Sequence, residues 1–287
     1  MISWQHMKEF SYIDTHAHLN LSAFADDREA VISRCAEASV SVINVGTKES
    51  TSQLAVTIAE AHENIYAIVG LHPIQTAPGV HDEDEVGEGS QPFTSRGEIF
   101  DAEFYRTLAK SKKVVGIGEC GFDYFHHDPA TRDIQEAAFI AQIELANELQ
   151  LPLMIHTRNA KEAIAGIDAY TDVYDVLKAN AKVPANIHFY AGTYEQAKRF
   201  FDIGCTISFT GVITFAKQYE ELVKNAPLEL IHAETDCPYV APKPYRGTRA
   251  EPWHVIEVVK KIAELKSLPV EQVQTQLIKN AEKLYRL

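Results

Sequence analysis

The chain has 287 residues, of which 46% are hydrophobic and 23% are charged. This composition is typical of a soluble globular protein with a large core, and no apolar run approaches the roughly 18 residues of a membrane helix. The formal net charge of −13 excludes a protein that coats nucleic acid non-specifically, because a field of that sign repels phosphate. Local positive charge would have to bind any phosphate-bearing substrate.

The cysteines and the N-terminus indicate a cellular compartment. The N-terminus lacks a basic segment followed by an apolar one, so we expect no secretory signal. The four cysteines form no C-x-x-C pair, and we expect reduced thiols in a cytoplasmic protein. They are Cys35, Cys120, Cys205 and Cys237. No repeat, heptad pattern or linker is present, which predicts a single domain over residues 1–287 and favours a monomer.

Short runs rich in Val and Ile alternate with longer segments of helical period, which predicts βα units and a parallel sheet. The predicted strands are Ser11–His16, Val40–Val45, Ile65–Leu71, Lys113–Glu119, Leu151–His156, Ala185–Phe189, Thr206–Ser208 and Leu228–Glu234. Helices are predicted over Asp26–Ala38, Asp133–Leu149 and Trp253–Lys266. Eight strands alternating with helices fit a closed (β/α)8 TIM-type barrel better than an open sheet.

The segment Gln75–Glu98 interrupts this alternation. It is rich in Gly and Pro and contains the acidic run Asp82–Glu85, so it predicts a long loop after the third strand. A solvated surface insertion is the favoured interpretation. The alternative is an active-site lid, because the loops that follow barrel strands lie on the functional face.

Several predicted strands end in a histidine or a carboxylate. In the first, D-T-H-A-H, the side chains of His16 and His18 share one face of the extended chain. Glu119 ends an apolar strand within G-I-G-E-C-G-F-D, where a buried carboxylate needs a cation or a hydrogen-bond donor. His156 and His188 each follow a further apolar strand, and Asp236 follows the last one.

Each of these residues alone has an ordinary structural explanation. A single histidine after an apolar strand is more often a satisfied core residue, and Glu119 could pair with a lysine or an arginine. In a βα barrel, however, all of these strand ends lie on one rim, so the residues are expected to converge. Imidazole and carboxylate ligands suit Zn, Mn, Fe or Mg. Cys120 and Cys237 adjoin Glu119 and Asp236 and are expected to point away from the metal.

The sequence resembles a known family through a series of ordered motifs. They are D-T-H-A-H-L, G-L-H-P at Gly70–Pro73, G-I-G-E-C-G-F-D, L-P-L-M-I-H-T-R, N-I-H-F-Y-A-G, E-T-D-C-P-Y-V-A-P and E-P-W. Together they resemble the TatD-type metal-dependent deoxyribonucleases of the amidohydrolase-like barrel superfamily, over nearly the whole chain. Members cleave DNA with divalent cations, often as 3′-to-5′ exonucleases.

The resemblance implies a role for each matching position. His16 and His18 would hold one metal ion together with Asp236. Glu119 would bridge to a second ion held by His156 and His188. His72 would lie beside the site and contact substrate phosphate or water. The implied cofactors are two divalent metal ions (Mg, Mn or Zn), and the implied substrate is DNA or another phosphodiester.

The sequence departs from the family pattern in three places. His188-Phe189-Tyr190-Ala191-Gly192 stands where members often carry H-C-F-S-G, and Ala250 stands before Glu251-Pro252 where an Asn is common. Gln75–Glu98 is also longer than usual. All metal-ligand positions are retained, so the departures bear on substrate preference and on the shape of the entrance.

A two-metal mechanism follows as a hypothesis. The metal ions would activate a water molecule, and Asp236 is the candidate general base. Arg158 is the first candidate for a phosphate clamp, because guanidinium binds phosphate through two hydrogen bonds. Lys243, Arg246 and Arg249 are weaker candidates. Tyr190 and Phe122 could stack on a base, although ordinary packing is slightly favoured for both.

Two other classes of function remain open. A metal-dependent amidohydrolase would cleave C–N bonds on a similar barrel, but its two-metal members often bridge the ions with a carboxylated lysine where this chain has Glu119. A non-catalytic metal-binding scaffold is the third interpretation, and the intact ligand set argues against it.

Overall fold

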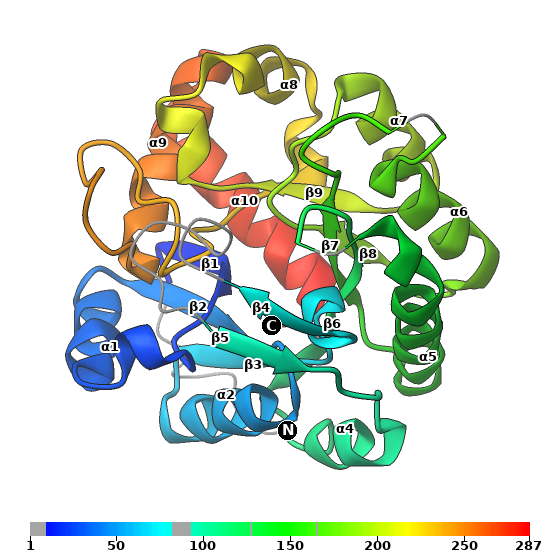
Figure 1. The fold of residues 1–287 in the computed structure, drawn as a ribbon. Coiled ribbons are helices and arrows are strands. Elements are labelled where there is room, and N and C mark those ends of the chain that lie inside the picture. The colour runs from blue at the N-terminus through cyan, green and yellow to red at the C-terminus, as the bar shows by residue number, and fades with distance from the viewer. Residues whose placement is uncertain (1–9, 82–92, 127, 165) are drawn as a thin grey trace, which may run out of the picture.

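The computed structural model describes residues 10–81, 93–126, 128–164 and 166–287. Eight parallel strands form one sheet in the order β1-β2-β3-β6-β7-β8-β9-β10, curved into a nearly closed barrel (Figure 1). These strands are Tyr12–Ala17 (β1), Val40–Val45 (β2), Ile65–Val69 (β3), Val114–Asp123 (β6), Leu153–Arg158 (β7), Ala185–Ile187 (β8), Thr206–Phe209 (β9) and Ile231–Ala233 (β10). The prediction of a (β/α)8 barrel is confirmed.

Helices surround the strands on the outside of the barrel (Figure 1). They are Arg28–Glu37 (α1), Glu49–Ala61 (α2), Ala102–Leu108 (α4), Arg132–Leu149 (α5), Ala169–Asn180 (α6), Tyr194–Asp202 (α7), Glu220–Asn225 (α8), Val255–Lys266 (α9) and Val270–Tyr285 (α10). Short 3-10 turns are Ser22–Phe24 (η1), Pro73–Gln75 (η2), Pro129–Thr131 (η3), Gly211–Thr214 (η4), Lys217–Tyr219 (η5), Leu228–Leu230 (η6) and Pro252–His254 (η7).

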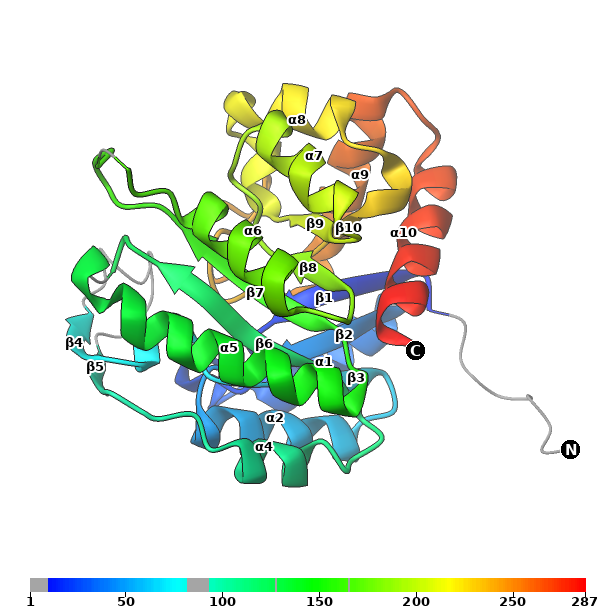
Figure 2. The ribbon, with the colours of Figure 1, turned by 90° about the vertical axis from the view of Figure 1, so that its right-hand side faces the viewer.

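Two apolar layers support the barrel. The outer layer lies between strands and helices and includes the buried thiols of Cys120 and Cys237. The inner layer joins strand residues such as Ile13 and Met154 to Leu284 and Tyr285 of α10. Helix α10 therefore closes the end of the barrel at which the strands begin, opposite the rim that carries β4 and β5 (Figure 2). The opposite, C-terminal rim is where the functional loops of a βα barrel lie.

The seam between β1 and β10 is held by single hydrogen bonds that involve side chains and backbone. The Thr15 hydroxyl donates to the Ala233 carbonyl at 3.2 Å, and the Thr235 amide donates to the Asp14 carboxylate at 2.9 Å. The amide of Asp236 then donates to the carbonyl of His16 at 2.9 Å. The same contacts that close the barrel therefore place Asp236 beside the first strand's end.

Glycines let β6 and β7 approach closely. Gly118 and Gly121 have φ values of +141° and +140°, and a Cβ at Gly121 would lie 2.1 Å from the carbonyl oxygen of His156. No other residue fits there, because a Cβ essentially never approaches a backbone oxygen so closely. The strand continues past Glu119 to Asp123, so the predicted end of Lys113–Glu119 falls short.

The prediction of a loop over Gln75–Glu98 is wrong in part. Pro78–His81 (β4) and Phe93–Arg96 (β5) pair as an antiparallel two-stranded sheet, separate from the barrel sheet and on its C-terminal rim (Figure 2). Strands this short, one beginning with a proline, carry no alternating pattern that a sequence would reveal. Residues 82–92, including the acidic run, lie outside the described residues.

The remaining boundaries differ by small amounts. Leu228–Leu230 of the last predicted strand forms η6, and only Ile231–Ala233 pairs with β9. No helix in the described part of the chain is long and apolar enough to cross a bilayer.

Candidate active site

Four side chains meet at the ends of β1, β6 and β10. The Nε2 atoms of His16 and His18 lie 3.1 Å apart. The Oδ1 atom of Asp236 is 3.4 Å from the His18 nitrogen and 3.7 Å from the His16 nitrogen. Glu119 Oε2 completes the group at 3.3 Å from His16 Nε2. All four side chains are buried, and we call them the first ligand group.

A second ligand group surrounds the other oxygen of the same carboxylate. Glu119 Oε1 lies 2.6 Å from His188 Nε2 and 2.9 Å from His156 Nδ1. The two imidazole nitrogens are 3.3 Å apart, and His72 Nε2 approaches Glu119 Oε1 at 3.3 Å. Glu119 thus presents one oxygen to each group.

Both groups have the size and the chemistry of a divalent-cation site. Ligands about 2.0–2.2 Å from an ion in tetrahedral or octahedral geometry lie roughly 3–3.5 Å from one another, which matches most of these separations. The donors are imidazole nitrogens and carboxylate oxygens, without thiolate, as Zn, Mn and Mg sites use. The residues present therefore fit a pair of divalent cations.

The electrostatics of Glu119 match such a role. Burial alone would raise the pKa of its carboxyl, but the imidazoles of His188, His72 and His16 outweigh burial and hold the pKa well below its usual range. The carboxylate in turn raises the pKa of His188 well above the ordinary value, against the effect of burial. Bound cations would displace the protons on the imidazole nitrogens that face Glu119, because a nitrogen must be deprotonated to bind a metal ion.

Acceptors behind the imidazoles fix which nitrogen faces the centre. Asp123 Oδ2 lies 2.8 Å from His156 Nε2, which leaves Nδ1 pointing at Glu119. The carbonyl of Val45 lies 2.8 Å from His18 Nδ1 and leaves Nε2 for the first group. Partners of this kind orient metal-binding histidines and raise their basicity.

Glu234 occupies the corresponding place behind His188, at 3.5 Å from Nδ1. Its carboxylate also accepts hydrogen bonds from the Phe189 amide and the Ser208 hydroxyl, each at 2.6 Å. These bonds hold the Glu234 carboxylate in place behind His188, and its oxygens also lie close enough to His16 and His188 to form a third group.

His72 is held as a neutral donor. Its Nδ1 accepts the Ile74 amide at 3.0 Å, so the remaining proton sits on Nε2, which faces Glu119. Burial lowers the pKa of His72 to about 4. At neutral pH this side chain can donate a hydrogen bond from Nε2 and cannot act as a base there.

The residues predicted to contact substrate outside the ligand groups differ in exposure and in pairing. Arg158, Lys243 and Arg246 are exposed. Arg249 is paired with Asp27 at 2.6 Å and with Glu251 at 3.3 Å, so its charge is engaged. The rings of Phe122 and Tyr190 are buried in the outer apolar layer and cannot stack on a base, so the favoured prediction of packing is confirmed.

Sequence reasoning missed Asp123 and Glu234 as parts of the site. Asp123 is visible in G-I-G-E-C-G-F-D and Glu234 in E-T-D-C-P, but each stands close to a carboxylate that is itself a predicted ligand. The signal was available: both are carboxylates at a strand end with an apolar strand before them. Each must be paired to be buried, and the predicted ligand histidines are the natural partners.

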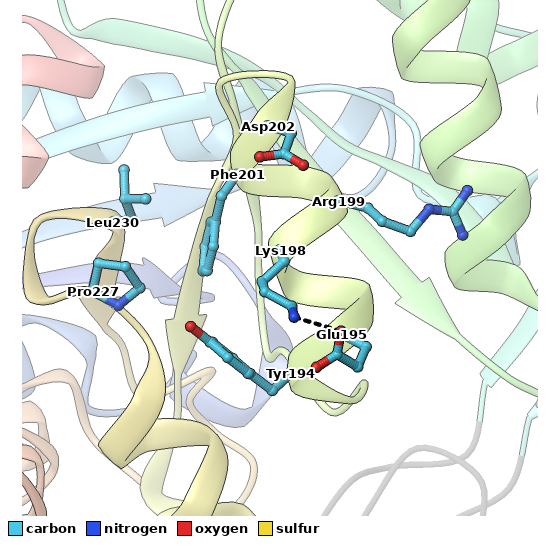
Figure 3. A pocket seen from close by; sticks show the side chains of 8 residues that line it. All are labelled: Tyr194, Glu195, Lys198, Arg199, Phe201, Asp202, Pro227 and Leu230. Atoms are coloured by element: carbon cyan, nitrogen blue, oxygen red, sulfur yellow. Dashed lines mark ion pairs between the residues drawn. The ribbon is translucent and has the colours of Figure 1, made fainter.

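A shallow pocket on the outside of the barrel lies away from these residues. Tyr194, Phe201 and Pro227 line it, and Lys198 pairs there with Glu195 at 2.5 Å (Figure 3). None of the predicted ligands contributes to it. The predicted ligands all lie at the barrel rim instead.

The fold and the rim residues are those of a metal-dependent hydrolase built on a barrel. The model of a family described as TatD related DNase matches residues 13–286, and the chain belongs to this family. The chain is 35% identical to "Uncharacterized metal-dependent hydrolase YabD" of Bacillus subtilis, over 96% of this chain and 98% of that protein. It is 32% identical to "3'-5' ssDNA/RNA exonuclease TatD" of Pantoea ananatis, over 96% and 99%.

Solved structures agree with this assignment. The crystal structure of YJJV, a TatD homologue from Escherichia coli, superposes with a TM-score of 0.78 at 25% identity and covers 96% of this chain and 98% of that one. An uncharacterised amidohydrolase from Saccharomyces cerevisiae superposes with a TM-score of 0.76 at 15% identity, which shows the shared fold alone.

Proposed function

We propose that this chain hydrolyses phosphodiester bonds of nucleic acid with two divalent cations. The observation that carries the proposal is the division of the Glu119 carboxylate, with Oε2 facing the first ligand group and Oε1 facing the second. The first ion would be held by His16, His18, Asp236 and Glu119. The second would be held by Glu119, His156 and His188.

Divalent cations at such a pair of positions lower the pKa of bound water and neutralise charge on the phosphate. Asp236 would accept the proton of the attacking water, and it is deprotonated for this role because the hydrogen bond from His18 and the nearby imidazoles hold its pKa below the usual range despite burial. His72 donates from Nε2 to a phosphate oxygen. Glu119 contributes to catalysis by fixing the positions of the two ligand groups relative to each other.

Arg158 extends the site toward the substrate. It lies two residues after His156 on β7, and alternate residues of a strand share a face. Its exposed guanidinium binds a phosphate next to the scissile one through two parallel hydrogen bonds. The activity of the Pantoea relative, a 3'-5' exonuclease on single-stranded DNA and RNA, supports DNA as a substrate and a 3′-to-5′ direction of cleavage for this chain.

The test is a cleavage assay with 5′-labelled and 3′-labelled single-stranded DNA in Mg²⁺, Mn²⁺, Zn²⁺ or a chelator. The proposal predicts metal-dependent shortening from the 3′ end and no product with chelator. Cleavage that persists after complete removal of metal contradicts it. Hydrolysis of a cyclic amide without hydrolysis of any phosphodiester would assign the chain to the amidohydrolase class instead.

A further inference from the structure

The guanidinium groups of two arginines on the C-terminal rim lie over phenylalanine rings. The guanidinium carbon of Arg158 is 3.8 Å from the ring centroid of Phe125, and that of Arg246 is 4.2 Å from the ring centroid of Phe215. The ammonium of Lys161 lies 4.8 Å from the Phe125 ring. We call Arg158–Phe125 and Arg246–Phe215 the two rim stacks.

The charges of the two rim stacks are not neutralised by a neighbouring carboxylate. Within the described residues, neither Arg158 nor Arg246 has a carboxylate at ion-pair distance, and both are exposed. Arg106, by contrast, forms ion pairs with Glu103 at 2.6 Å and with Glu148 at 2.8 Å. In a protein with a net charge of −13, two unneutralised guanidinium groups on one rim are a local positive field.

The stacks are carried by the loops that also carry the ligand groups. Arg158 follows His156 on β7, and Phe125 follows the end of β6. Arg246 lies in the segment that begins at Asp236, from which the Tyr239 ring reaches to 6.4 Å from the His18 ring.

Phe215 follows η4, the turn after β9. The segment with Arg246 is tied to this turn by a hydrogen bond from the Lys243 amide to the Thr214 hydroxyl at 2.9 Å. Each stack thus includes an arginine on a segment that continues from a predicted ligand, Arg158 after His156 and Arg246 after Asp236.

We propose that the two rim stacks bind a single-stranded polynucleotide on either side of the ligand groups. This inference rests on the proposed function and names its substrate more closely. A ring beneath the guanidinium holds the side chain in place, so its N–H edge is pre-organised for a phosphate and its outer face is free for an unpaired base. Neither contact reads base identity, so binding is independent of sequence.

Single strands fit this arrangement better than a duplex. Base stacking on a planar group requires an unpaired base, and a duplex offers only its phosphates. The two stacks belong to loops on opposite sides of β8, so a flexible strand can bend across the mouth between them. We therefore assign the stacks to single-stranded DNA or RNA.

Binding without cleavage tests the inference. The protein in excess chelator is titrated into a fluorescein-labelled oligothymidylate of about 20 nucleotides, and anisotropy is followed across salt concentrations. Arg158→Gln and Arg246→Gln are compared with Arg199→Gln. Arg199 is a control for the contact between guanidinium and ring, because its guanidinium lies 4.1 Å from the Tyr174 ring on the outer helices, away from the rim, although Asp175 approaches it at 3.9 Å.

Each rim variant should weaken binding about fivefold or more at low salt, and the slope of log K against log salt should fall by roughly 0.7 for each phosphate that the variant no longer binds. Arg199→Gln should bind as the unmodified protein does. Unchanged binding in both rim variants, an equal loss in Arg199→Gln, or tighter binding of a duplex than of the single strand would overturn the inference. Failure of the proposed function is separate, since it would appear as absent cleavage by the unmodified protein with metal.

Discussion

Replacing Asp123, the carboxylate behind His156, should perturb the second ligand group and leave the first unchanged. Asp123 is fully buried, and its Oδ2 lies 2.8 Å from His156 Nε2 and 2.7 Å from His126 Nδ1. Burial would raise the pKa of Asp123, but its bonds to His126 and His156 hold the pKa well below the usual range, so the group is charged. Asp123→Asn removes this charge with little change of volume.

The consequence for His156 follows from the hydrogen bonds. Asp123 Oδ1 accepts the amides of Phe125 and His126 at 2.9 and 2.8 Å, so the Asn oxygen will keep that side. Its NH₂ group then faces His156 Nε2 and favours the tautomer that carries the proton on Nδ1. That tautomer cannot bind a cation at Nδ1. We expect affinity at the second ligand group to fall roughly 10- to 100-fold, or about 1.4–2.7 kcal/mol.

The assay is calorimetric titration of Zn²⁺ or Mn²⁺ into chelator-treated protein, with thermal unfolding measured in parallel. Asp172→Asn is the control, because its carboxylate accepts the Tyr124 hydroxyl at 2.6 Å without touching a predicted ligand. One binding event should weaken in Asp123→Asn and the other should stay within about threefold. Equal weakening of both events, or of neither, would refute the reasoning.

Two further predictions concern stability. A Cβ at Gly121 would lie 2.1 Å from the His156 carbonyl oxygen, so Gly121→Ala should lower the free energy of unfolding by about 3 kcal/mol in chemical denaturation. Gly204 also has a positive φ, +81°, but open space around it, so Gly204→Ala should lower the same free energy by only about 1 kcal/mol. Similar losses in both variants would contradict this. Burial lowers the pKa of His232 from its ordinary 6.5 to about 3, so the folded state holds it neutral while the unfolded chain binds a proton. Its contribution to stability is therefore full above pH 6.5 and is lost as pH falls toward 3, by about 2.7 kcal/mol at pH 4.5. Urea unfolding of His232→Gln should show a loss between about pH 8 and pH 4.5 that is smaller by this amount, and an unchanged loss would count against it.

The ends of the strands were predictable because the local pattern decides them. An apolar run followed directly by His156 or His188 marks both the strand and its functional end, and the parallel sheet brings such ends to one rim. This rule predicts that the six ligand positions converge, and the family resemblance implies the role of each. The structure brings together His16, His18, Glu119, His156, His188 and Asp236.

The remaining features depend on contacts between distant segments. Strand β6 continues past Glu119 because Gly118 and Gly121 allow it to run against β7, and this extension places Asp123 behind His156. The strands β4 and β5 are too short to show an alternation of apolar and polar residues, so the sequence does not reveal their pairing. The rim stacks are likewise invisible in sequence, because Phe215 and Arg246 meet only when the loops after β9 and β10 pack together.

The most direct measurement is the metal content of the protein with and without Glu119. Chelator-treated protein is reloaded with Zn²⁺ or Mn²⁺, freed of excess ion and examined by elemental analysis, for the unmodified chain and for Glu119→Ala. The shared carboxylate predicts two ions per chain in the first and one or none in the second, together with loss of nuclease activity. Two tightly held ions and persisting activity in Glu119→Ala would contradict it.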